Sequence, residues 1–323
     1  MSALDTGGPG GDPAGSDASR RERLDAAMAA VNRILLGKAP QVRLAFACLL
    51  ARGHLLIEDL PGVGKTTLSH ALATVLGADY QRIQFTSDLM PADILGVSIY
   101  RRDREAFEFH PGPVFADIVL ADEINRATPK TQSALLEAMA EGQVTIEGVT
   151  HDLPDPFFVI ATQNPVDLVG TFPLPDSQLD RFLLSISLGF PDAAVERELL
   201  RSEDRSSLLR RTGAVLSTDD VRALQRDCER VHVSDPLLSY VQSLLAESRN
   251  SRWFEIGLSP RAGLALLRCA RAVAYIDGRD FVAPEDVKAV FPGLARHRMT
   301  VSHGLEASVE DQVSELLAQV AVP

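Results

Sequence analysis

The stretch Pro61-Gly62-Val63-Gly64-Lys65-Thr66-Thr67 decides the fold of this chain. It follows a short apolar run, His54 to Ile57, and opens an amphipathic segment that Gly77 closes. A strand, a glycine-rich loop and a helix in that order are typical of phosphate binding, because the loop N–H groups and the positive end of the helix dipole both favour an anion. We expect these seven residues to hold the phosphates of a nucleotide, with Lys65 on the β- and γ-phosphates and the Thr66 hydroxyl on Mg²⁺.

One position departs from the strict form of this motif. The pattern G-x-x-x-x-G-K-[ST] places glycine where this chain has Asp59. The departure lowers the strength of the pattern match. Taken alone, the loop could still be an ordinary glycine turn.

A second signal lies downstream, where the apolar run Ile118 to Ala121 ends in Asp122 and Glu123. The run predicts a buried strand, which disfavours the alternative of two unrelated surface acids. Phosphoryl transfer needs a cation, a metal ion and an oriented water. We therefore expect Asp122 to hold Mg²⁺ through its water shell and Glu123 to polarise the attacking water. Together the two motifs predict binding and hydrolysis of ATP.

Composition and charge narrow the class of protein. Of 323 residues 46% are hydrophobic and 24% are charged, as in an ordinary soluble protein, and no apolar run is long enough to cross a membrane. The acidic, glycine-rich start does not resemble a signal peptide. A net charge of -12 disfavours nucleic acid as the partner. Cys48, Cys228 and Cys269 lack metal-ligand spacing, so we expect buried, reduced thiols in a cytoplasmic protein.

The order of apolar runs predicts an α/β core. Residues 1–20 are expected to be disordered, and residues 21–190 to form a nucleotide-binding domain that starts with a helix from Arg21 to near Leu36. Strands that alternate with helices indicate a mainly parallel sheet, with ligands at the carboxyl ends of its strands. The five expected strands are His54–Ile57, Tyr80–Phe85, Ile118–Ala121, Phe157–Ala161 and Leu183–Leu188.

Two hairpins and a helical region complete the outline. Val97–Tyr100 pairs with Phe107–His110, and residues 143–146 with 149–152 around Glu147-Gly148, while Thr128-Pro129 starts a helix that Gly142 ends. Residues 191–323 are expected to form a small all-helical domain. Its predicted helices are Ala194–Ser202, Thr218–Val231, Pro236–Ser248, Pro260–Asp277, Pro284–Val290 and Leu305–Val320.

Five motifs in order give the chain a family resemblance. They are Pro-Gly-Val-Gly-Lys-Thr, Ala-Asp-Glu-Ile-Asn-Arg-Ala, Ala-Thr-Gln-Asn-Pro, Leu-Pro-Asp-Ser-Gln-Leu-Asp-Arg-Phe and Leu-Ser-Pro-Arg. From Ile34 to Arg298 the chain resembles AAA+ ATPases of the MoxR type, in the helix-2-insert clade. The resemblance implies a P-loop αβα core and a helical lid. It also implies that a residue other than glycine at Asp59 is tolerated.

The resemblance assigns roles to four further polar residues. Asn164 matches the first sensor, although an Asn before Pro is often a turn residue. Arg181 matches an arginine finger that reaches the γ-phosphate of a neighbouring subunit, the alternative being a salt bridge with Asp180 or another acid. Arg261 matches the second sensor, and whether it acts on its own subunit or a neighbour's stays open. Arg126 is expected at the subunit interface.

Other segments are interpreted by resemblance alone. Leu36 and Gly37 are expected near the adenine. Residues 87–112 resemble the insertion that marks the clade, and residues 143–152 resemble the hairpin before the first sensor. In the family these protrusions face a central pore or a partner, and the alternative is plain decoration of the sheet edge.

The resemblance points to a chaperone-like motor that remodels protein complexes. It implies a hexameric ring and a partner with a von Willebrand factor A domain. Two rival hypotheses are a DNA-dependent, helicase-like motor, which the acidic charge disfavours, and a nucleotide switch without a motor, which Glu123 and Arg181 disfavour. GTP is disfavoured because the chain has no Asn-Lys-x-Asp motif.

Overall fold

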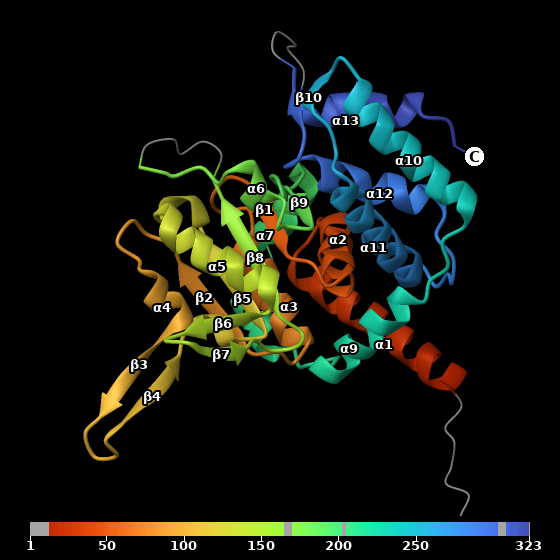
Figure 1. Ribbon diagram of the computed structural model, residues 1–323. Coiled ribbons are helices and arrows are strands. Elements are labelled where there is room, and N and C mark those ends of the chain that lie inside the picture. Colours follow the sequence, from red (N-terminus) through yellow and green to blue (C-terminus); the bar gives the residue numbers. More distant parts are fainter. Residues whose placement is uncertain (1–12, 165–169, 202–204, 303–307, 323) are drawn as a thin grey trace, which may run out of the picture.

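The computed structural model describes residues 13–164, 170–201, 205–302 and 308–322 (Figure 1). Its centre is a parallel sheet of five strands in the order β2-β5-β8-β1-β9, which confirms the five expected strands and the α/β class. In that spatial order the strands are β2 (Tyr80–Gln84), β5 (Ile118–Asp122), β8 (Phe158–Gln163), β1 (Leu55–Glu58) and β9 (Leu184–Ile186).

The sheet lies between two apolar clusters because side chains alternate along its buried strands. In β1, Leu55 and Ile57 enter one cluster and Leu56 enters the other. Helices α1, α2 and α3 cover the first face, and α4 and α5 cover the second. Their bounds are Pro13–Ile34, Ala39–Leu50, Lys65–Val75, Pro91–Leu95 and Pro129–Glu141. Both faces are closed, so a ligand has access at the carboxyl edge of the sheet.

Both expected hairpins are present and project together from one side of the core (Figure 1). They pair β3 (Gly96–Arg101) with β4 (Ala106–Pro111) and β6 (Gln143–Ile146) with β7 (Val149–Asp152). The rings of Phe109 in β4 and His151 in β7 stack with centroids 4.1 Å apart. The two hairpins are therefore joined to each other.

The carboxyl-terminal region is helical apart from one small sheet. The expectation of an all-helical region is wrong there, because β10 (Phe254–Ile256) pairs with β11 (Thr300–Val301). Strands of two or three residues are too short to show an alternating pattern. The first residues of the helix expected from Leu305 lie outside the described part of the chain. The lid helices are α9 (Thr218–Glu229), α10 (Asp235–Asn250), α11 (Pro260–Ile276), α12 (Pro284–Ala295) and α13 (Val309–Gln319).

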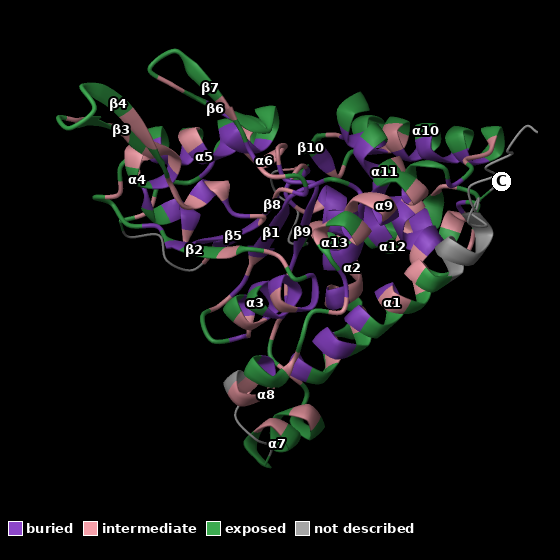
Figure 2. Cartoon of the chain, turned by 90° about the horizontal axis from the view of Figure 1, so that it is seen from below, coloured by how far each residue is buried: buried purple, intermediate pink, exposed green. Residues whose placement is uncertain are grey.

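Two other boundaries differ from expectation. Helix α1 begins at Pro13, a favoured residue for a first helical turn, so residues 13–20 are helical and not a disordered tail. Residues 1–12 of that expected tail lie outside the described part. After Pro191, α7 (Ala193–Arg201) and the unpredicted, strongly basic α8 (Arg205–Arg211) lie below α3, away from the lid helices (Figure 2).

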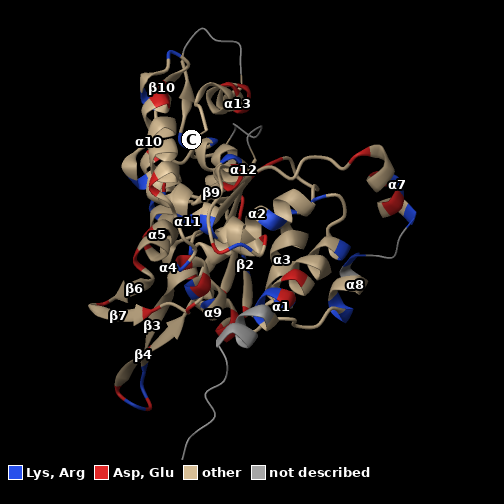
Figure 3. Ribbon diagram, turned by 90° about the vertical axis from the view of Figure 1, so that its right-hand side faces the viewer, with Lys and Arg blue, Asp and Glu red and all other residues tan. Residues whose placement is uncertain are grey.

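The cysteines and the charged residues are distributed over the fold as follows. All three cysteines are free and buried, as expected. Basic and acidic residues are interspersed on α1, on α7 and at the turn of the first hairpin (Figure 3). In the described residues, no helix combines the length and the apolar character that a membrane crossing requires.

Candidate functional site

The phosphate loop, residues 59–65, connects the end of β1 to the first residue of α3. Gly62 and Gly64 have φ of +85° and +103°, in the left-handed region that favours glycine. A Cβ on Gly64 would also lie 2.9 Å from Leu35 Cδ1. The backbone conformation therefore favours glycine at position 64, Leu35 packs closely against it, and the loop leads its N–H groups to the amino end of α3.

Lys65 is held by its own loop. Its Nζ donates a hydrogen bond of 2.8 Å to the Asp59 carbonyl oxygen, and the residue is 9% exposed. Burial lowers the pKa of Lys65, and the charges of Asp122, Asp59 and Glu123 oppose that shift. The structure thus brings the loop cation and the downstream acids to one place, as expected.

The departure at Asp59 has a structural explanation. Its Oδ2 accepts hydrogen bonds from Ser187 Oγ at 2.9 Å and Gly189 N at 2.7 Å, and Oδ1 accepts one from Leu60 N at 2.9 Å. Burial alone would raise the pKa of Asp59, but the hydrogen bonds from Gly189, Ser187 and Leu60 outweigh it and hold the pKa below its usual value. The carboxylate ties the phosphate loop to the chain after β9, a contact that glycine cannot make.

The acid pair at the end of β5 is organised by a residue that sequence reasoning missed. Thr162 in β8 is fully buried and donates from Oγ1 to Asp122 Oδ1 at 2.6 Å. The same Oγ1 accepts the Glu123 N–H at 2.9 Å, and Glu123 has φ +57°. A polar residue within an apolar strand was the available signal. Thr162 fixes the direction of both acids through one hydroxyl.

Side chains from β2 and from the turn after β5 form hydrogen bonds and ion pairs with the carboxylate oxygens of Asp122 and Glu123. Arg82 Nη2 lies 2.7 Å from Asp122 Oδ2, and Gln84 Nε2 donates to Glu123 Oε2 at 3.0 Å. Arg126, expected at a subunit interface, pairs through Nε with Glu123 Oε2 at 2.9 Å. Arg82 and Gln84 were missed because the sequence does not reveal that β2 pairs with β5.

The donor set fits a nucleotide with Mg²⁺. The hydroxyl of Thr66, which is exposed in the first turn of α3, and the Asp122 carboxylate are oxygen ligands of the kind that Mg²⁺ prefers. When bound, the ion would supply positive charge to the phosphates. Asn164 follows the last residue of β8, which lies between β5 and β1, so it stands between the acids and the phosphate loop.

The two remaining arginines contact other groups. Arg181 follows α6 (Asp176–Leu179), and its Nη1 donates to the Leu136 carbonyl oxygen of α5 at 2.9 Å. Arg261 in the first turn of α11 is 69% exposed and lies 3.8 Å from Asp180 Oδ2. Asp180 instead has a close partner in Arg298, at 2.7 Å. The alternative of an Arg181–Asp180 salt bridge is not realised, and neither expected arginine contacts the phosphate loop among the described residues.

The turn expected near the adenine lies beside α7. Gly37 has φ +69°, and a Cβ there would lie 3.0 Å from Val195 Cγ2. Lys38, which the sequence did not single out, is buried and donates from Nζ to the Phe190 carbonyl oxygen at 3.0 Å. Since Leu35 in the same turn reaches Gly64, this turn and the phosphate loop are in contact.

Comparison with known proteins decides the family. The model of the ATPase family associated with various cellular activities (AAA) matches residues 54–184, and that of the AAA lid domain matches residues 246–317. The chain is 40% identical to Chaperone MoxR1 of Mycobacterium tuberculosis over 96% of this chain and 86% of that protein. The chain belongs to the MoxR-type AAA+ ATPases. This confirms the resemblance read from the five motifs.

Other proteins are similar to this MoxR-type chain along nearly its whole length. Protein MoxR of Paracoccus denitrificans is 33% identical over 93% of this chain and 96% of its own length. Uncharacterized protein YeaC of Bacillus subtilis is 45% identical over 93% and 95%. The crystal structure of an ATPase candidate from Cytophaga hutchinsonii matches with a TM-score of 0.89 and 34% identity, over 96% of this chain and 98% of that one. The AAA+ core and helical lid are therefore shared along nearly the whole chain.

Proposed function

We propose that this MoxR-type protein binds ATP with Mg²⁺ and hydrolyses it at the carboxyl edge of the sheet. Residues 61–67 would hold the phosphates, Thr66 and Asp122 the metal ion, and Gly37 the base. Glu123 would orient the attacking water, with Asn164 as sensor. The observation that carries the proposal is that the buried Lys65 of the phosphate loop experiences the charges of both Asp122 and Glu123, so that a cation for the phosphates lies near the proposed metal ligand and the acid that would polarise the attacking water.

We propose that Arg181 and Arg261 complete the site in a hexameric ring. Arg181 would reach the γ-phosphate of a neighbouring subunit, and Arg261 would couple the lid to the nucleotide. The support is that both guanidinium groups contact Asp180 or α5 in their own chain and not its phosphate loop. A site assembled from two subunits turns over only where the ring is formed.

We propose that the ring remodels protein complexes with a von Willebrand factor A domain protein as partner. The joined hairpins are a suitable contact surface, since exposed apolar side chains there are costly unless a partner covers them. The exposed side chains are Val97, Ile99, Tyr100, Phe107 and Val149. The M. tuberculosis relative is named Chaperone MoxR1, which supports the same role.

Affinity capture with Glu123→Gln tests this function. The variant should bind ATP, lose turnover and remain in the ATP-bound ring, so that mass spectrometry identifies partners retained with ATP and released with ADP. Wild-type protein under the same conditions is the control, because it hydrolyses the ATP that holds the partner. Normal turnover by Glu123→Gln would contradict the role of Glu123, and stimulation of turnover by DNA would favour the helicase-like alternative.

The division of the chain also stays a proposal. We propose a nucleotide-binding domain up to residue 190 and a lid from residue 191, with α7 and α8 as the connection that packs on the core. The backbone N–H groups of Val215 and Leu216 both donate to the Val75 carbonyl oxygen of α3, at 2.8 and 2.9 Å. We also propose that the protein acts in the cytoplasm.

A further inference from the structure

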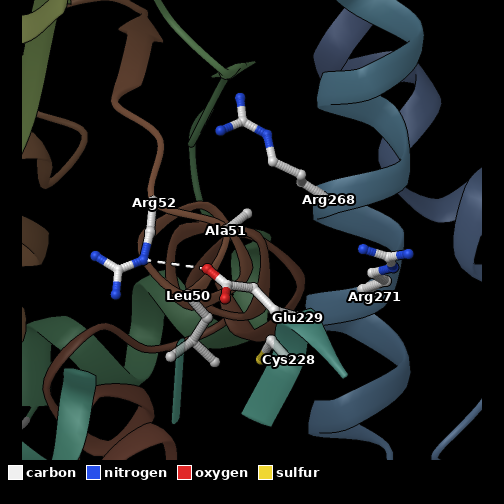
Figure 4. A pocket seen from close by; sticks show the side chains of 7 residues that line it. All are labelled: Leu50, Ala51, Arg52, Cys228, Glu229, Arg268 and Arg271. Carbon is white, nitrogen blue, oxygen red and sulfur yellow. Dashed lines mark ion pairs between the residues drawn. The ribbon is translucent and has the colours of Figure 1, made fainter. Parts of the chain in front are cut away.

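A small basic hollow lies apart from the candidate nucleotide site. It has a volume of about 80 Å³, opens to solvent and is formed where the end of α2, the end of α9 and the middle of α11 meet (Figure 4). Three of its lining side chains are arginines and one is an acid. The lining consists of Leu50, Ala51, Arg52, Cys228, Glu229, Arg268 and Arg271.

The positive charge of the hollow is poorly compensated. Arg52 lies 3.4 Å from Glu229 and 3.3 Å from Asp155, and these two carboxylates are 62% and 57% exposed. Across the described part of the chain, Arg268 and Arg271 take part in no ion pair. Exposed pairs of the Arg52 kind contribute little. An excess of positive charge at one place is unusual in a chain of net charge -12 and favours an anion there.

Arg271 also carries an unsatisfied donor. Its Nε is buried and has no hydrogen-bond acceptor. A buried donor without an acceptor is unfavourable, and an oxyanion in the hollow would supply the acceptor that Arg271 lacks. Arg268 and Arg271 are three residues apart on α11, which places them on neighbouring turns of one face. An oxyanion in the hollow would meet both guanidinium groups.

The backbone conformation of Arg52 also supports a role for its side chain in the hollow. Arg52 has φ +52°, in the region that glycine adopts most easily, and its N–H donates to the Leu49 carbonyl oxygen at 3.0 Å as α2 ends. A non-glycine residue is disfavoured in this conformation. Glycine would avoid that cost, so the side chain of Arg52 is what this position contributes. In Figure 4 it lies on the side of the hollow opposite α11, with its Nε toward Glu229 and its terminal nitrogens turned away from α11.

We propose that this hollow binds the phosphate group of a small molecule, or free phosphate. Guanidinium groups bind the oxygens of a tetrahedral phosphate in pairs, and the buried Leu50, Ala51 and Cys228 provide an apolar floor that strengthens these interactions. The space admits one such group and not a folded acidic peptide. Because α11 begins next to Arg261 and the turn after α2 leads into β1, a bound phosphate would join the lid to the strand that precedes the phosphate loop.

Calorimetry on the full chain tests the proposal independently of hydrolysis. ADP with beryllium fluoride first fills the candidate nucleotide site, and inorganic phosphate or glycerol 3-phosphate is then titrated in separate arms. The double variant Arg268→Ala/Arg271→Ala should bind at least about tenfold more weakly, a loss of about 1.4 kcal/mol. Arg230→Ala is the matched control, since Arg230 directly follows α9, is 79% exposed and is not part of the hollow lining. Its affinity should equal that of the wild type.

Each outcome of these titrations either supports or overturns the proposal. Tighter binding of glycerol 3-phosphate than of phosphate would identify a phosphomonoester as the ligand, and equal binding would identify free phosphate. If the alanine variant unfolds, Arg268→Lys/Arg271→Lys keeps the charge and removes the planar forks, and it should still lose affinity. Absence of saturable binding below roughly 10 mM in either arm, or equal binding by the double variant, would overturn the proposal. Binding of an acidic peptide alone would also overturn it.

Discussion

Lys65 is 9% exposed and bound within its own loop, whereas Arg261 is 69% exposed and lies 3.8 Å from Asp180. The phosphate half of the site, residues 59–65 with Asp122 and Glu123, is fixed by buried hydrogen bonds to β8 and to the chain after β9. The arginine half, Arg181 and Arg261, rests on α5 and Asp180. One chain can therefore organise nucleotide binding alone, and we infer that catalysis needs a second chain.

Substitution of Arg181 is expected to have the largest effect, and it tests whether the arginine half is needed for catalysis. We expect Arg181→Ala to lower ATP turnover by about 10³-fold, because an arginine finger neutralises charge in the transition state. Steady-state phosphate release measures the loss, and fluorescent-nucleotide titration should show unchanged ATP affinity. The hydrogen bond to the Leu136 carbonyl oxygen is worth about 1 kcal/mol, so the fold is retained.

Arg181→Lys separates charge from geometry. It keeps the cation and loses the planar fork, so its turnover should fall between wild type and Arg181→Ala. Turnover of Arg181→Ala within roughly twofold of wild type would remove Arg181 from the site.

Asp59 tests how the phosphate half is held. Asp59→Asn would turn an amide donor or a weaker acceptor toward Ser187 and Gly189, and we expect it to lower the free energy of unfolding by about 2 kcal/mol. ATP affinity should weaken with it, because the loop loses its anchor. Urea unfolding and nucleotide titration measure the two effects. Asp103→Asn, at an exposed acid of the first hairpin, is the matched control and should change neither.

A substitution of Arg82 tests whether this side chain competes with Mg²⁺ for Asp122. Arg82 and Mg²⁺ would compete for the same Asp122 oxygen, so Arg82→Gln should lower the Mg²⁺ concentration needed for half-maximal ATP binding by about three- to tenfold. ATP binding is titrated with Mg²⁺ in a chelator-buffered series, and affinity without the ion is the internal control. An unchanged or higher Mg²⁺ requirement would show that Arg82 does not oppose the metal.

The smallest expected effect is a pH dependence shared by both halves. Burial lowers the pKa of His54, at the amino end of β1, to about 4, and burial with the charge of Arg298 lowers the pKa of His297, which contacts the Phe182 carbonyl oxygen, to about 3. As pH falls below 6.5 the unfolded chain takes up protons that the folded chain does not, so stability falls. From pH 7 to 6 we expect a loss of about 0.7 kcal/mol for each histidine.

Unfolding of His54→Gln and His297→Gln at both pH values measures this slope. Each variant should lose about half of the wild-type pH dependence, whatever its absolute stability. A slope that survives in the double variant would assign the effect to other groups.

The sequence predicted the parts of the site that are contiguous in the chain. The phosphate loop, the strand ending in Asp122 and both hairpins depend on local patterns, and the structure contains them. The contacts of Asp59, Thr162 and Arg82 could not be predicted, because each joins residues that lie at least 39 positions apart, and a single sequence does not reveal strand neighbours.

The arginine half shows a different limit. Motif position predicted roles for Arg181 and Arg261, but their contacts depend on packing between α5, α6 and α11 and, in our proposal, on a neighbouring subunit. Neither the packing of these helices nor a contact between subunits can be predicted from a local sequence pattern. The roles of these residues stay predictions.

Mixing two inactive variants tests the central claim most directly. Lys65→Ala should fail to bind ATP but still supply Arg181, and Arg181→Ala should bind ATP without the finger. Alone, each should retain less than about 1% of wild-type turnover, and an equimolar mixture should recover up to about a quarter, since one interface in four then joins an intact pocket to an intact finger. Turnover of the mixture equal to the average of its parts would contradict a site shared between subunits.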